Sequence, residues 1–152
     1  MPHAVPPRAD DAPEGPTLAD VLARGGTLAE AHGITREMGE VIAGLAEGEL
    51  EAGRAEAARA ILEGLVATNH LDPGAWALLS RAHRRLGQPL AARLCAEVGA
   101  RLAPADPPVR LARAEALLAC GERETGRAEL ALLEGDEQVG ARARALLAAL
   151  GP

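Results

Sequence analysis

The fold of this chain is decided by residues 39–71, GEVIAGLAEGELEAGRAEAARAILEGLVATNHL, because the pattern in this stretch returns twice. Its glycine at position 53 recurs as Gly87 and Gly121, at intervals of 34 residues. Small residues stand at two fixed places around these glycines: Ala46, Ser80 and Ala114 before them, and Ala58, Ala92 and Gly126 after them. Agreement of this kind in three copies indicates a true repeat rather than the chance recurrence of an alanine-rich helical bundle.

A period of 34 residues is typical of tetratricopeptide repeats. The middle copy follows the W-x2-L-G-x2-Y order of that repeat, with substitutes at two places: Trp76, Leu79, Ser80, His83, and then Ala92 and Pro104. Small residues let the two helices of a repeat approach closely, and each glycine ends the first helix. Stacked hairpins bury a continuous core and leave a concave side. The sequence therefore predicts an all-α tetratricopeptide-repeat solenoid of three helix-turn-helix repeats, with N-terminal helices and a C-terminal capping helix.

The segments outside the repeats have distinct compositions. Residues 1–16 contain five prolines among charges and alanines, which predicts a disordered proline-rich tail. Residues 17–34 are expected to form an N-terminal helical segment, with helices starting at Thr17 and Thr27 and a capping box between Thr27 and Glu30. We expect the three repeats to fill residues 35–135. Residues 136–152 are expected to form a capping helix that covers the last repeat.

The composition favours one acidic, cytoplasmic domain. The chain has 152 residues, 48% of them hydrophobic, with one Trp and no Phe or Tyr, so its core must consist of aliphatic residues and alanine. A net charge of −6 without a basic run argues against a nucleic-acid partner. The longest apolar run is only Ala145 to Leu150, and no signal peptide is recognisable at the start, so we expect no membrane partner.

No pattern of catalytic or metal-binding residues is visible in the sequence. Cys95 and Cys120 lie far apart without a CxxC spacing, and we expect both to be reduced apolar residues. The four histidines are scattered, and no phosphate-binding loop follows Gly25 and Gly26. We therefore expect no enzyme, no catalytic residue, no metal, no cofactor and no small-molecule substrate.

The stretch VLARGGTLAEAHGIT, residues 21–35, resembles the start of the class II chaperones of type III secretion, of the SycD/LcrH type. The resemblance runs from about Thr17 to Leu133 and includes EAGRAEAA and PPVRLARAEALLACGE, which match the first and third repeats of that family. It implies a bacterial cytoplasmic chaperone that binds an extended segment of a secreted, translocator-like protein in its concave groove without nucleotide. It also implies a possible homodimer through the N-terminal helices.

One departure from the family concerns the groove. The resemblance implies aromatic residues on the first helix of repeat one, where this chain has Ala43, Glu47 and Leu50. Either the client motif differs from that of the family, or the chain is a diverged paralogue with another partner.

Helical geometry places one set of residues on the concave side of the first helices. This expected groove consists of Ala43, Glu47, Leu50, Glu51, Ala77, Arg81, Arg84, Arg85, Leu111, Glu115 and Leu118. Small apolar residues with charged rims suit an extended peptide with a few aliphatic anchors. The three arginines repel one another, which an acidic partner explains; the alternative is that they only solvate an exposed face. A second apolar stripe, Leu18, Val21 and Leu22, is the expected self-association surface.

Two rival functions remain within the repeat fold. A co-chaperone that clamps a C-terminal carboxylate needs lysine, asparagine and arginine at positions that here hold Ala43, Glu47, Leu78, Pro108 and Ala112, which argues against it. A general protein-interaction scaffold in another bacterial assembly is the alternative that the repeats alone allow.

Overall fold

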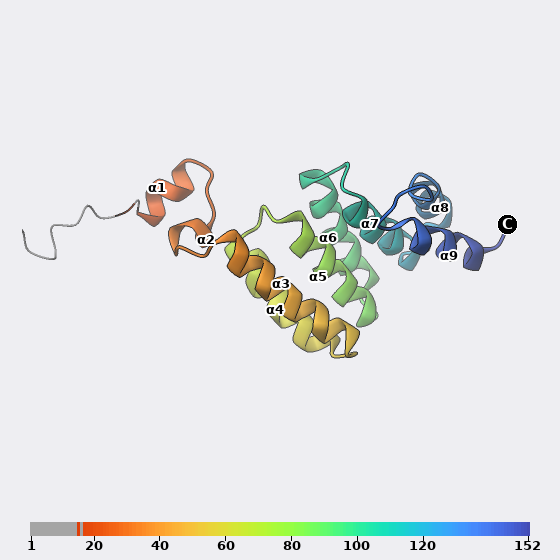
Figure 1. The fold of residues 1–152 in the computed structure, drawn as a ribbon, viewed down its shortest axis with the longest axis horizontal. Helices are drawn as coiled ribbons and strands as arrows, with labels where there is room; N and C mark the ends of the chain where they lie inside the picture. The colour runs from red at the N-terminus through yellow and green to blue at the C-terminus, as the bar shows by residue number, and fades with distance from the viewer. Residues whose placement is uncertain (1–14, 16) are drawn as a thin grey trace, which may run out of the picture.

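The computed structural model describes residue 15 and residues 17–152, and this part of the chain contains nine helices and no strand (Figure 1). The helices are α1 (Leu18–Ala23), α2 (Leu28–Ala31), α3 (Arg36–Glu51), α4 (Ala55–Thr68), α5 (Pro73–Arg85), α6 (Pro89–Leu102), α7 (Pro107–Ala119), α8 (Arg123–Ala131) and α9 (Gly140–Leu150). The predicted all-α architecture is confirmed. The expected tail of residues 1–16 lies, apart from Gly15, outside the described residues.

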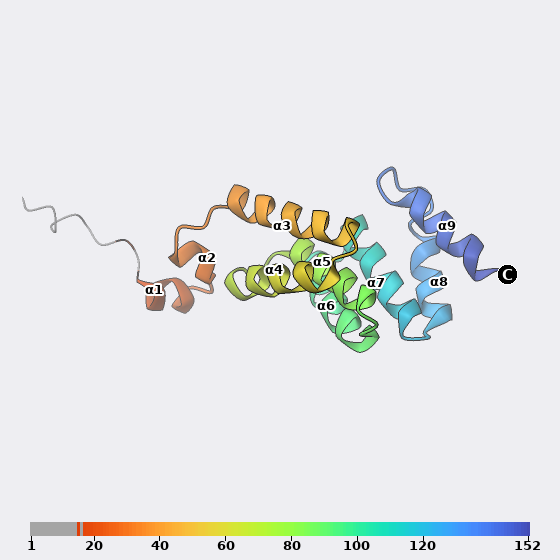
Figure 2. The same cartoon turned by 90° about the horizontal axis from the view of Figure 1, so that it is seen from below.

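The long helices form three hairpins that stack along the molecule. Within the hairpins, α3 packs on α4, α5 on α6 and α7 on α8, while α5 contacts both α4 and α7. Figure 2 shows the hairpins following one another along the long axis, with α9 at the far end beside α8. The helices α1 and α2 extend from the opposite end and touch the repeats through contacts between α2 and α4. The first helices of successive hairpins therefore lie next to one another and share one surface.

Each repeat glycine stands in the hairpin turn. Gly53, Gly87 and Gly121 have φ angles of 77°, 68° and 83°. This left-handed conformation ends the first helix at little cost only for a residue without a side chain. The 34-residue spacing thus reflects a repeated need for the same turn, as the sequence predicted.

The helices of each hairpin cross at small, buried residues. Ala46, Ala58, Ala92 and Ala114 are 0% exposed. In the third hairpin the crossing is tighter, because a Cβ atom at Gly126 would lie 2.7 Å from Cδ2 of Leu118. A glycine therefore replaces the alanine found at the equivalent place in the other two repeats.

Side-chain caps determine where several helices begin. Thr17, Thr27 and Thr35 each accept a hydrogen bond from the backbone N–H three residues later. The reciprocal capping box, expected at Thr27, is formed instead by Thr17 and Asp20, whose carboxylate accepts a bond of 3.0 Å from the Thr17 N–H. At Thr27 the structure shows only the bond from the Glu30 N–H, at 3.2 Å.

The core is aliphatic. Leu50, Leu62, Leu117 and Leu130 are among the largest fully buried side chains. One core cluster contains residues of α3, α4, α5 and α6, and another lies between α7, α8 and α9. Ala143 of α9 is 0% exposed in the second cluster, so α9 covers the last repeat as the capping helix that the sequence predicted.

Candidate functional site

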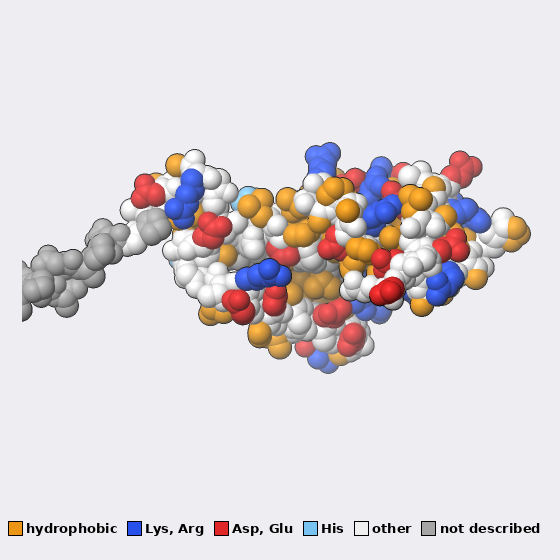
Figure 3. Space-filling model, turned by 45° about the horizontal axis from the view of Figure 1, so that its top comes forward, with side chains coloured by type: hydrophobic (Ala, Val, Ile, Leu, Met, Phe, Trp, Pro, Cys, Tyr) orange, Lys and Arg blue, Asp and Glu red, His pale blue; other side chains and the backbone are white. Residues whose placement is uncertain are grey.

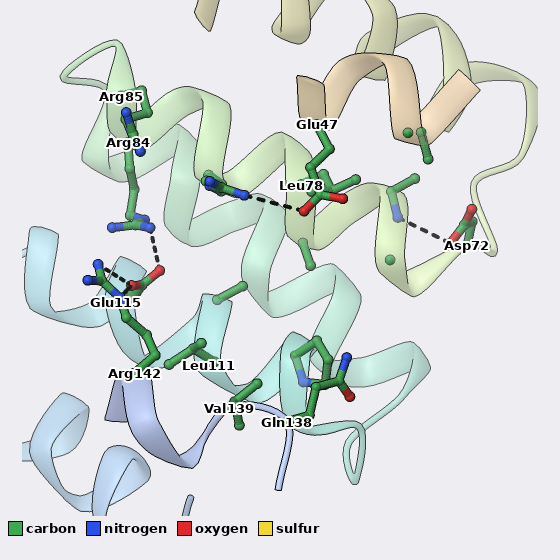
Figure 4. A pocket seen from close by; sticks show the side chains of 18 of the residues that line it. Glu47, Asp72, Leu78, Arg84, Arg85, Leu111, Glu115, Gln138, Val139 and Arg142 are labelled. Carbon is green, nitrogen blue, oxygen red and sulfur yellow. Dashed lines mark hydrogen bonds and ion pairs between the residues drawn. The ribbon is translucent and has the colours of Figure 1, made fainter. Parts of the chain in front are cut away.

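A groove of about 850 Å³ crosses the first helices of the three hairpins. Residues of α3, α5 and α7 line it, and the loop before α9 together with Arg142 of α9 adds a fourth wall. The close-up in Figure 4 shows Leu78 beside Glu47, and Leu111 and Val139 close together in another part of this surface. The face drawn in Figure 3 is hollowed near its centre, where apolar side chains lie between acidic and basic ones. A groove lined by both apolar and charged side chains can accommodate an extended peptide that carries aliphatic side chains and a few charges.

Most of the expected groove residues do come together. Those that line the groove are Ala43, Glu47, Ala77, Arg81, Arg84, Arg85, Leu111 and Glu115. Their role in binding remains a prediction.

Three residues that were expected to line the groove do not line it: Leu50, Glu51 and Leu118. Leu50 is 1% exposed and belongs to the core cluster shared by α3, α4 and α5, because these helices converge near the hairpin turn. Leu118, in the last turn of α7, is half-buried and packs against the core of the third repeat, where it meets Gly126. Glu51 is exposed at the end of α3 and does not line the groove.

Several lining residues were absent from the expected groove. Leu78, Pro108 and Ala112 line it, and the sequence offered a signal for them, since they occupy positions that carry the charged clamp in other repeat proteins. Gln138, Val139 and Arg142 line it as well. They follow the last repeat, so the 34-residue period gives no information about them.

The charges of the groove are partly paired within the protein. Arg81 of α5 lies 3.5 Å from Glu47 of α3, which occupies the equivalent place one repeat earlier. Glu115 of α7 pairs with Arg84 of α5 and, at 3.0 Å, with Arg142 of α9. The charged rims expected for the groove are therefore partly neutralised within the protein.

Arg84 and Glu115 are the least exposed members of this network, with 22% and 10% of their side chains accessible. Burial lowers the pKa of Arg84; Glu115 opposes that shift, whereas Arg142, Arg81 and Arg85 reinforce it. The Nε of Arg84 is buried without a hydrogen-bond partner among the described residues. The carboxylate of Glu115 thus pairs with two guanidinium groups, and the one of Arg84 keeps a buried N–H donor without an acceptor among these residues.

The N-terminal stripe is narrower than expected. Leu18 and Leu22 are 44% and 49% exposed, but Val21 is 0% exposed. Val21 turns inward because the chain reverses at Gly26, where an added Cβ would lie 2.6 Å from Cγ1 of Val21. Only Leu18 and Leu22 are therefore available to a second molecule.

Outside the groove, we considered metal-binding clusters, the two cysteine thiols and membrane-spanning helices. The described residues contain no group of three or more His, Cys, Asp or Glu side chains that could hold a metal ion. Cys95 and Cys120 are both free thiols. Burial, followed by the nearby charge of Glu63, raises the pKa of Cys95 to about 11, which keeps this thiol protonated at neutral pH. In the same part of the chain, no helix combines the length and the hydrophobicity that crossing a membrane requires.

Comparison with known families identifies the repeats. Residues 26–82 match the family model described as tetratricopeptide repeat. Together with the three stacked hairpins, this match decides the class. The fold is that of tetratricopeptide repeats.

Solved structures extend this similarity beyond the matched repeats. The type III secretion translocator chaperone SycD of Yersinia enterocolitica superposes with a TM-score of 0.70 at 25% identity, over 82% of this chain and 98% of SycD. A type III secretion complex from Aeromonas hydrophila gives a TM-score of 0.72 at 25% identity, with coverage of 88% and 93%. PcrH of Pseudomonas aeruginosa, solved with the chaperone binding region of PopD, superposes with a TM-score of 0.62 at 26% identity, over 78% of this chain and 94% of PcrH. The tetratricopeptide repeats thus share the architecture of the translocator chaperones, as the sequence resemblance implied. The search of curated proteins returned no significant sequence match.

Proposed function

We propose that the protein is a bacterial cytoplasmic chaperone that acts without nucleotide and holds an extended segment of a secreted, translocator-type protein in its groove. The observation that carries this proposal is the groove itself, which the first helices of all three repeats build and which reaches α9. Similarity to SycD, a translocator chaperone, and to PcrH, solved with the chaperone binding region of PopD, supports the same role.

The lining supports an extended segment with small aliphatic anchors. Ala43, Ala77 and Ala112 leave room for a peptide backbone, while Leu78 and Leu111 offer apolar contact. Because no aromatic side chain among the described residues lines the groove, it offers aliphatic contact to an anchor and no surface on which a ring could stack. We therefore propose that the client motif differs from one that fits aromatic-lined pockets.

The test is to fill the groove. Ala112 is half-buried on α7 and lines the groove, so Ala112→Trp should occupy the space of the segment. Fragments of the proteins encoded by the source genome are displayed on phage and selected on the full chain, and the affinities of the recovered fragments are measured by fluorescence anisotropy. We expect Ala112→Trp to weaken binding more than about tenfold, a loss of about 1.4 kcal/mol.

The matched control is Ala60→Trp, on the exposed surface of α4 and outside the groove. It adds the same side chain and should leave the affinity within about twofold of the intact chain. Equal affinities for the intact chain and Ala112→Trp would refute the proposed site.

Self-association through the N-terminal segment is a further part of this proposal. Leu18 and Leu22 are exposed on one side of α1. Sedimentation of the intact chain beside a Leu18→Glu and Leu22→Glu double variant is the measurement, and the double variant should sediment as a monomer. A double variant that sediments like the intact chain would disprove a dimer made by these leucines.

A further inference from the structure

One edge of the groove carries more positive charge than the protein neutralises. We name Arg84, Arg85 and Arg142 the arginine edge; all three line the groove. Within the described residues, Glu115 is the carboxylate that pairs with Arg84 and Arg142, and Arg85 is exposed without an ion pair. In Figure 4 Arg84 and Arg142 reach Glu115 from different helices, to one side of Leu111 and Val139. Three guanidinium groups therefore lie along this edge beside one carboxylate, which pairs with only two of them.

The excess charge lies in a partly dehydrated place. Only 22% of the Arg84 side chain is exposed, and its Nε lacks a partner among the described residues. Charges removed from water without full pairing are costly. The C-terminal end of α5 supplies a partial negative charge of roughly half a unit, which offsets part of the imbalance but less than one guanidinium. Repulsion by Arg142, Arg81 and Arg85 also lowers the pKa of Arg84, in agreement with this geometry.

We propose that the arginine edge binds a side-chain carboxylate, an aspartate or glutamate, within the extended segment that the groove holds. This inference rests on the proposed function and adds the charge of the ligand to it. A carboxylate fits because a guanidinium group can donate two parallel N–H bonds to its oxygens. The exposed guanidinium group of Arg85 has unused donors, and the added negative charge would offset the excess.

The position of the arginine edge favours a side chain over the C-terminal carboxylate. The three arginines lie to one side of the apolar residues Leu78, Leu111 and Val139 (Figure 4). A chain laid from Leu78 of α5 to Leu111 of α7 and Val139 would run alongside the arginines rather than end at them. The group that meets them is then a side chain.

The experiment uses peptides of roughly ten residues, the extended length that spans three helices packed 8–10 Å apart. A phage-displayed random library of such peptides is selected on the full-length protein, and the recovered peptides are resynthesised with fluorescein. Each is also made with Asp→Asn or Glu→Gln, and with an amidated C-terminus. We expect loss of the side-chain charge to weaken binding by about tenfold or more, while amidation has less than about a twofold effect.

The protein variants are Arg85→Gln and Arg142→Gln, chosen because Arg85 is exposed and Arg142 has 58% of its side chain accessible. Each variant should bind the acidic peptide about tenfold more weakly than the intact protein does. Its affinity for the matching Asn or Gln peptide should fall by less than about twofold, which would show that the arginine and the carboxylate interact directly. Arg101→Gln is the matched control, because Arg101 is exposed on α6 and lies outside the groove. It should leave both peptides unaffected.

Three outcomes separate this inference from the proposed function. In the first outcome, Ala112→Trp prevents peptide binding, but the peptides bind the intact protein equally well without their side-chain charge. The groove then binds extended segments, and the arginine edge is not a carboxylate site. If amidation is what weakens binding, the terminus is recognised and the inference is likewise overturned. If no recovered peptide depends on Ala112, the groove does not bind extended segments and both proposals fail.

Discussion

Replacing Leu50 with glutamate should unfold the protein. Leu50 is 1% exposed in the core cluster that joins α3, α4 and α5, so the variant loses the packing of a leucine and places a carboxylate among Ala46, Ala58 and Leu62. Loss of the leucine alone costs about 2–5 kcal/mol, and an unpaired buried charge adds to this cost. Against the 5–15 kcal/mol typical of a folded domain, we expect a loss of at least about 4 kcal/mol of unfolding free energy.

The measurement is urea unfolding followed by circular dichroism. Leu45→Glu is the matched control, since Leu45 lies on the same helix but is 62% exposed, and it should change the unfolding free energy by less than about 0.5 kcal/mol. A Leu50→Glu protein with full helix content and an unfolding free energy within about 1 kcal/mol of the intact chain would show that Leu50 is not in the core.

Glu115→Ala should lower the free energy of unfolding by about 3 kcal/mol. The variant leaves the largely buried Arg84 without its carboxylate, so the positive charges of Arg84 and Arg142 lie close together at the arginine edge without a negative charge between them. Breaking a buried pair from one side is costly because the remaining charge stays dehydrated. Thermal and urea unfolding of the purified variant give the size of the loss.

Arg142→Ala is the control for this pair. The Arg142 side chain is 58% exposed, and after its removal Glu115 still pairs with Arg84, so the cost should stay below about 1 kcal/mol. Equal costs for Glu115→Ala and Arg142→Ala would contradict the view that Glu115 holds the network together.

The fold was predictable because its determinants are local and recur. Gly53, Gly87 and Gly121 each need the left-handed conformation, and the small residues that flank them at fixed spacing mark the helix crossings. A repeat of 34 residues that combines these two requirements leaves few alternatives to stacked helical hairpins.

The site was predictable only where one repeat resembles the next. Ala43 and Ala77 line the groove at equivalent positions, but Leu50 and Leu118, near the hairpin turns, pack inward. Helical periodicity locates one side of a helix and does not say how far along its length a neighbouring helix covers that side. Residues of α9 lie beyond the repeats, so only the three-dimensional structure brings Arg142 to Glu115.

The central claim is that an extended segment lies in the groove. The most direct measurement is photo-crosslinking with benzoylphenylalanine placed at Ala112, which lines the groove, or at Ala60, which is exposed on α4 outside it. A fluorescein-labelled peptide selected on the full chain is added, and the crosslinked product is located by mass spectrometry. We expect the peptide to crosslink from position 112 and not from position 60. Crosslinking from position 60 alone would contradict the account and move the binding site to the outer surface of α4.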